Sequence, residues 1–113
     1  MGGLRSEIML EVLFDARGNL CGYQARCEGR VGAISARYRQ LFEYAFRMKA
    51  AGFVLVHNHP SGDSRPSVQD IAATRALAAV ARAMDVEFFD HVIVGGRAAV
   101  SMKRAGLIPG ARV

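Results

Sequence analysis

The chain has 113 residues, a length that suits one domain built around one hydrophobic core. Hydrophobic residues make up 51% of it, so the composition argues against a disordered protein. No apolar run approaches the roughly 20 residues that a membrane-spanning helix needs, and residues 1–5 lack the apolar core of a signal peptide. We therefore expect a single domain over residues 1–113, located in the cytoplasm and without a membrane partner.

The net charge of +5 favours acidic partners, nucleic acid included. The arginines are nevertheless scattered along the whole chain, and no run of lysine and arginine alternates with aromatic residues. We interpret the charge mainly as solvated surface, and contact with DNA is the weaker interpretation.

The first part of the chain predicts two paired strands. Residues 6–15 are mostly hydrophobic, as expected for a buried strand. Residues 16–19 have the composition of a hairpin turn, and residues 20–27 predict the returning strand. Residues 29–32 predict a loop that ends in a short extended segment.

Two segments predict helices. Ser35 suits the N-cap of a helix over residues 36–50, in which apolar side chains recur every three or four residues. Gly52 suits a stop at the C-terminal end of this helix. Residues 67–84 predict a second helix, whose alanines allow close packing.

The remaining segments complete a sheet. Residues 53–56 and 86–94 predict buried strands, and residues 98–101 predict a short final strand. A turn at residues 103–106 and a loose tail at 109–113 follow. Strands at both ends of the chain with helices between them predict an α/β or α+β architecture, in which a mixed sheet packs against helices.

The most informative stretch follows the strand over residues 53–56. His57 and His59 stand one residue apart at the strand end, so their side chains lie on the same side of the backbone. Asp70 falls in the first turn of the next helix, and we expect the two elements to converge across the loop. Two imidazoles and one carboxylate are a typical protein ligand set for a catalytic zinc ion, with the fourth position left to water.

Several residues in and after this loop stand at characteristic spacing: His57, His59, Pro60, Gly62, Pro66, Ser67 and Asp70. His-x-His-Pro followed by Ser-x-x-Asp resembles the motif of the JAMM (MPN) metalloproteases, and the added glycine and proline make it similar to the RadC branch. The resemblance runs from about residue 7 to residue 107. It implies a curved mixed β-sheet flanked by helices, of the cytidine-deaminase-like type, and a Zn²⁺ site formed by the two histidines and Asp70. Longer RadC proteins also carry an N-terminal helical region of DNA-binding type, which these 113 residues do not include.

The resemblance implies catalytic roles for two further residues. Ser67 corresponds to a serine that stabilises the oxyanion by a hydrogen bond. A glutamate on an early strand acts as general base in the JAMM family, and in RadC-like chains it stands eight residues before an aspartate that closes the strand. Glu7 has this relation to Asp15. Glu11 competes for the role because it shares a face with Glu7 on a regular strand, but the spacing favours Glu7.

Structural explanations compete with some of these roles. Ser67 and Asp70 also match a helix capping box, and the two roles of Asp70 are compatible because one carboxylate oxygen can bind metal while the other accepts from the backbone. Asp63 stands in a turn-forming stretch and is interpreted as part of the loop. Asp90 and His91 point to opposite faces of a strand, so we leave both outside the site and expect His91 to be a satisfied structural residue.

The sequence therefore predicts a zinc-dependent hydrolase of the JAMM type. In such a metallopeptidase, a metal-activated water attacks a peptide or isopeptide bond of a protein or peptide substrate. The alternative is a DNA repair or recombination accessory protein that binds DNA without hydrolysis. It depends on the usual label of the RadC family and on the basic charge, and it predicts binding that weakens steeply with rising salt.

Overall fold

The computed structural model describes residues 7–27 and 38–109. In chain order its elements are β1 (Ile8–Phe14), β2 (Leu20–Cys27), α1 (Tyr38–Arg47), β3 (Gly52–Asn58), α2 (Val68–Ala83), β4 (Glu87–Gly95) and β5 (Ala98–Ser101). The predicted hairpin turn is confirmed between β1 and β2, and the predicted turn at residues 103–106 follows β5. The expected loop at residues 29–32, the expected N-cap at Ser35 and most of the expected tail lie outside the described residues.

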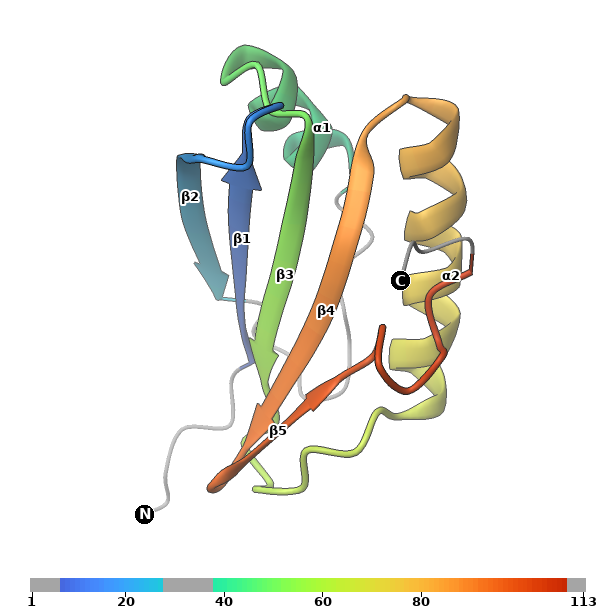
Figure 1. Cartoon of the computed structure of the whole chain (residues 1–113). Coiled ribbons are helices and arrows are strands. Elements are labelled where there is room, and N and C mark those ends of the chain that lie inside the picture. Colours follow the sequence, from blue (N-terminus) through green and yellow to red (C-terminus); the bar gives the residue numbers. More distant parts are fainter. Residues whose placement is uncertain (1–6, 28–37, 110–113) are drawn as a thin grey trace.

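Within the described residues, a five-stranded sheet in the order β2-β1-β3-β4-β5 forms the body of the molecule (Figure 1). β3 and β4 are parallel, and the other neighbouring pairs are antiparallel. Parallel neighbours need a crossover connection, which here contains α2. α2 therefore begins near the end of the sheet where β3 finishes. The mixed sheet with helices confirms the predicted α+β class.

One face of the sheet and helices α1 and α2 share a hydrophobic core. Successive side chains of a strand point to opposite faces, and those facing the core include Leu13, Phe53 and Ile93, each 0% exposed. Phe42 of α1 packs edge-on against Phe53, with ring centroids 6.0 Å apart. Leu77 joins the same core from α2. Polar side chains near the ends of this sheet face are consequently buried as well.

The end of α1 differs from the expectation. The helix ends at Arg47 rather than near residue 50, and Lys49 takes the left-handed conformation after it, with φ 58°. Gly52 is not the helix stop but the first residue of β3. A Cβ atom there would lie 2.7 Å from the backbone oxygen of Glu87, so glycine is required by the close approach of β4 rather than by a helix end.

Candidate metal centre

The two predicted histidines lie where β3 ends and the loop to α2 begins. Phe53, Leu55 and His57 alternate along the buried face of β3, so the pattern that buries the strand also buries His57, whose exposed fraction is 1%. His59 lies just beyond the strand. Its backbone N–H donates to the carbonyl of Val94 (2.8 Å) and so holds the loop on β4. In Figure 1 this is the lower end of the sheet, near the start of α2.

Glu7 reaches the same place from the neighbouring strand. Met9 of β1 pairs with His57 in the antiparallel ladder, and Glu7 precedes Met9 by two residues, so Glu7 and His57 share the buried face. The Oε1 atom of Glu7 lies 3.8 Å from Nε2 of His57. On the other face, the Asn58 side chain accepts a hydrogen bond from the backbone N–H of Ile8 (2.6 Å) and ties the start of β1 to the end of β3.

Glu11 occupies a different position on the buried face that carries Glu7 and His57. It is also buried, but it pairs with Leu55 in the ladder and accepts a hydrogen bond from Nε2 of Gln24. Because Leu55 precedes His57 by two residues, Glu11 lies further along the buried face, away from the end of β3 where the histidines are. The geometry therefore brings Glu7, the glutamate that the spacing favours, next to the histidine pair.

Asp70 approaches the histidines from the first turn of α2. Ser67 is the N-cap of this helix: its Oγ accepts from the backbone N–H of Asp70 (3.0 Å), and Oδ2 of Asp70 accepts from the backbone N–H of Ser67 (2.8 Å). This confirms the predicted capping box. Asp70 is fully buried, with Oδ2 2.9 Å from Nε2 of His59 and Oδ1 3.6 Å from Nε2 of His57. The cap thus aims the carboxylate at both histidines.

This cluster has the chemistry of a metal site. Among the described residues, Glu7, His57 and His59 each offer a ligand atom within 4.8 Å of the others, and Asp70 adjoins them. Within the residues that the structure describes, Nε2 of His57 and Oδ1 of Asp70 are also buried without a hydrogen-bond partner. Buried polar atoms rarely stay unsatisfied. A cation bound by imidazole nitrogen and carboxylate oxygen would satisfy both atoms, so the residues fit a metal ion.

Two residues outside the predicted site, His91 and Thr74, form a chain of side-chain hydrogen bonds that starts at Nδ1 of His57. Nδ1 of His57 lies 2.7 Å from Nε2 of His91, and Nδ1 of His91 lies 2.7 Å from Oγ1 of Thr74. All three side chains are 1% exposed. His91 is the satisfied residue that the sequence predicts, but its partner is a candidate ligand. Asp90 points elsewhere and accepts a hydrogen bond from Ser101.

Different signals could have identified these two residues. Thr74 stands four residues after Asp70, which puts both on one face of α2, and this spacing is legible in the sequence. The position of His91 depends on the register of β4 against β3, where Leu55 pairs with His91. No local pattern in the sequence gives that register.

Burial keeps the two inner histidines neutral near neutral pH. It lowers the pKa of His57 to about 4, although the Asp70 carboxylate acts in the opposite direction, and it lowers the pKa of His91 to about 3. A neutral imidazole carries one N–H and one lone pair. Each ring can therefore present a lone pair from only one nitrogen at a time.

The loop between His59 and Ser67 fixes the second histidine. Nδ1 of His59 lies 2.7 Å from the backbone oxygen of Asp63, which can only accept, so Nδ1 carries a hydrogen, while Nε2 faces Oδ2 of Asp70 at 2.9 Å. The side chain of Asp63 instead pairs with Arg65 (2.7 Å), whose hydrogen bonds lower the pKa of Asp63 to about 2. Asp63 is thus a loop residue, as interpreted from the sequence. A Cβ atom at Gly95 would lie 2.6 Å from the nitrogen of Ser64, so the loop packs closely on the end of β4.

The cluster opens to the surface through a cavity of about 420 Å³. Glu7, His59 and Ser67 line this cavity, together with loop residues such as Pro60 and Arg65. The Ser67 hydroxyl accepts one hydrogen bond within the cap, which leaves its own hydrogen free to donate toward the cavity. A substrate in this cavity would therefore meet a carboxylate, an imidazole and a hydroxyl.

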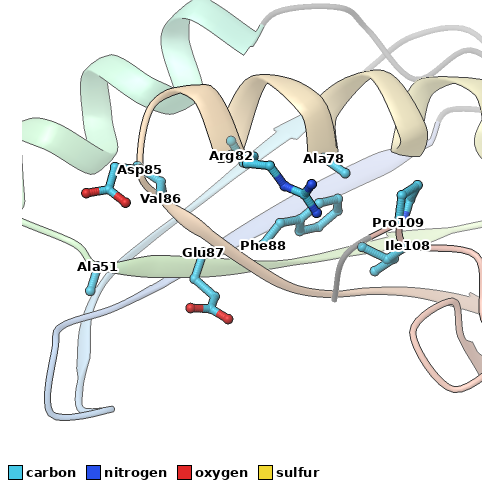
Figure 2. Close-up of a pocket in the computed structure, with 10 residues that line it drawn as sticks. Ala51, Ala78, Arg82, Asp85, Val86, Glu87, Phe88, Ile108 and Pro109 are labelled. Carbon is cyan, nitrogen blue, oxygen red and sulfur yellow. The ribbon is translucent and has the colours of Figure 1, made fainter. Parts of the chain in front are cut away.

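Another cavity, of about 230 Å³, lies between the C-terminal half of α2 and β4 (Figure 2). Arg82 extends from α2 toward it, and the carboxylates of Asp85 and Glu87 point away from the Arg82 guanidinium. The walls are completed by apolar residues such as Phe88 and Ile108. It shares no lining residue with the cavity of the histidine pair, so we do not connect it with the metal centre.

Comparison with known proteins agrees with this architecture. The family described as RadC-like JAB domain matches residues 1–107. The chain is 34% identical over 107 residues to a UPF0758 protein of Roseiflexus castenholzii, covering 95% of this chain and 46% of the relative. It is 43% identical over 81 residues to one of Halalkalibacterium halodurans (72% and 35%) and 36% identical over 102 residues to one of Protochlamydia amoebophila (90% and 44%). The chain thus spans about half, or less, of the length of these curated relatives.

A mixed five-stranded sheet within the described residues, with a Glu/His/His group at its end, is compatible with a JAB (MPN) domain. The chain belongs to the RadC-like JAB domain family, as its sequence motif predicts. Over the described ranges, no helix is long and apolar enough to cross a membrane.

Proposed function

We propose that this domain is a zinc-dependent hydrolase of the JAMM type that cleaves a peptide or isopeptide bond in a protein or peptide substrate. The observation that carries the proposal is the convergence of two histidines and two carboxylates, Asp70 and Glu7, on one buried point beside a cavity. The family of the chain and the two buried atoms without hydrogen-bond partners support it.

His57, His59 and Asp70 would hold the zinc ion, and the Oδ2 atom of Asp70 accepts from the backbone N–H of Ser67 in the capping box. When bound, zinc supplies Lewis-acid chemistry, which makes water nucleophilic near neutral pH and polarises a carbonyl group. Two imidazoles and one carboxylate are a donor set that occurs in catalytic zinc sites.

Glu7 acts as the general base and then as the general acid, and Ser67 stabilises the oxyanion. The Glu7 carboxylate takes the proton of the attacking water and then passes it to the amine that leaves. The Ser67 hydroxyl donates a hydrogen bond to the oxyanion that forms as the carbonyl is attacked. Its rigid place at the N-cap of α2 fixes where this donor points.

Metal content tests the centre directly. Wild type, His59→Ala and Asp63→Asn are loaded with zinc, desalted and measured by elemental analysis. We expect about one zinc per chain in the wild type and in Asp63→Asn, whose carboxylate pairs with Arg65, and none in His59→Ala. A peptidase screen of the zinc-loaded wild type follows.

Two results would overturn the proposal at different points. A folded wild type that retains no zinc removes the metal centre, and binding to DNA at low salt would then be measured. Zinc retention without hydrolysis of any peptide or isopeptide substrate keeps the metal centre and removes the hydrolase.

A further inference from the structure

We propose that His91 is a positioning residue for His57, and that His91 and Thr74 together form a two-state relay which lets His57 present either a hydrogen or a lone pair at Nε2. The inference depends on the metal centre of the proposed function.

The contacts among His57, His91 and Thr74 allow two hydrogen-bond arrangements. In the first, Thr74 donates to Nδ1 of His91, Nε2–H of His91 donates to Nδ1 of His57, and the hydrogen of His57 is on Nε2. In the second, Nδ1–H of His57 donates to Nε2 of His91, Nδ1–H of His91 donates to Thr74, and Thr74 turns its hydroxyl toward the Met102 sulfur, 3.5 Å away.

The surroundings of Nε2 decide between them. Oδ1 of Asp70 and Oε1 of Glu7 lie 3.6 and 3.8 Å from this nitrogen. Without a cation, a hydrogen on Nε2 suits these carboxylates and a lone pair does not, because like partial charges repel. The first arrangement is therefore favoured in the metal-free chain. A ligand to a cation needs its lone pair on Nε2, which requires the second arrangement.

His91 can serve both arrangements because its ring nitrogen can donate or accept. A backbone carbonyl, the common partner of a metal-binding histidine, only accepts; His59 has such a partner in Asp63. Both arrangements contain the same hydrogens, one on each ring and one on Thr74, so all three side chains stay neutral and no proton is gained or lost by the group.

Nitrogen NMR tests the relay without an activity assay. Long-range ¹H–¹⁵N spectra of ring-labelled protein give the protonated nitrogen of each of the three histidines, which single His→Gln variants assign. We expect hydrogen on Nε2 of His91 in the metal-free wild type and on Nδ1 after zinc loading. The same nitrogen protonated in both states would overturn the relay.

Zinc affinity, measured by competition with a chelator, tests the positioning role. His91→Leu removes the acceptor for Nδ1–H of His57, and loss of such a partner weakens metal binding by about 10- to 100-fold. His91→Gln keeps an amide near the place of Nε2 and is expected to stay within about threefold of wild type. Thr74→Val should weaken binding and Thr74→Ser should not, which gives a second pair if His91→Leu does not fold.

The outcomes separate this inference from the proposed function. Equal zinc affinity in folded wild type and His91→Leu overturns the positioning role while the metal centre stands. Zinc binding with the expected change at His91 but no hydrolysis supports the relay and removes only the hydrolase. A wild type that takes up no zinc overturns the metal centre, and the relay with it.

Discussion

At the scale of single residues, the two carboxylates beside His57 differ in orientation and in access to the cavity, which Glu7 lines and Asp70 does not. Asp70 is fixed in the cap of α2, with Oδ1 directed at His57 and Oδ2 at His59. Glu7 comes from the start of β1 and lines the cavity. This contrast favours Asp70 as the ligand and Glu7 as the base, although ligand-type atoms of Glu7 and both histidines also lie within 4.8 Å of one another.

Isosteric variants separate these two roles. Glu7→Gln is expected to keep about one zinc per chain and to lose hydrolysis by roughly 10²- to 10⁴-fold, the usual contribution of a general base. Asp70→Asn is expected to lose zinc. Glu11→Gln is the matched control, because Glu11 shares the buried face of Glu7 but lies beside Leu55, and it should keep both zinc and activity. Zinc loss in Glu7→Gln with retention in Asp70→Asn would exchange the two roles.

At the scale of the element, one residue of α2, its N-cap Ser67, has a role in helix stability and a proposed role in catalysis. Ser67 accepts the hydrogen bond that caps the helix and also lines the cavity. Ser67→Ala should therefore cost about 1 kcal/mol of unfolding free energy, which lowers Tm by about 4 °C in a domain of this size. If the hydroxyl also stabilises the oxyanion, kcat should fall by roughly 10²- to 10³-fold.

A capping loss alone cannot produce that fall in kcat at temperatures well below Tm, so the two measurements together distinguish the roles of Ser67. Asn in place of Ser67 provides the control, since asparagine caps helices as well as serine does. Ser67→Asn with wild-type Tm and a reduced kcat would support the catalytic role. A fall in Tm with unchanged kcat in Ser67→Ala would leave Ser67 as a cap only.

At the scale of the whole molecule, two buried neutral histidines link stability to pH. The pKa is about 4 for His57 and about 3 for His91 in the folded chain, whereas an unfolded histidine titrates near 6.5. Below pH 6.5 the unfolded chain therefore binds protons that the folded chain does not, and the free energy of unfolding falls as pH drops. The contribution of the two neutral rings to the free energy of unfolding is complete above about pH 6.5 and is lost progressively as pH falls toward 4 for His57 and toward 3 for His91.

Urea denaturation of the metal-free protein in chelator, from pH 7.5 to pH 4.5, measures this loss. His91→Gln should show a weaker dependence on pH, because it removes one of the two buried titrating groups. A free energy of unfolding that is constant between pH 7 and pH 5 would contradict the neutral burial of these rings.

The sequence by itself determined what depends on near neighbours. The hydrophobic run predicts β1, turn residues predict the hairpin that leads into β2, and β5 and α2 lie within one residue of the expected bounds. The capping box of Ser67 and Asp70 and the placement of His57 and His59 on one side of a strand end are local consequences of spacing. These features depend on residues that are close together in the sequence, so the sequence alone predicts them.

Only the tertiary structure decided which distant side chains meet. The register of β1 against β3 places Glu7 rather than Glu11 beside His57, and the register of β4 against β3 brings His91 behind it. The need for glycine at position 52 likewise depends on how closely β3 approaches β4. Registers arise from pairing across long stretches of chain, where shifting by one residue would reverse the buried face. The spacing to Asp15, which resembles that of RadC-like chains, favours Glu7, but the registers themselves are fixed only when the strands pair around the shared core.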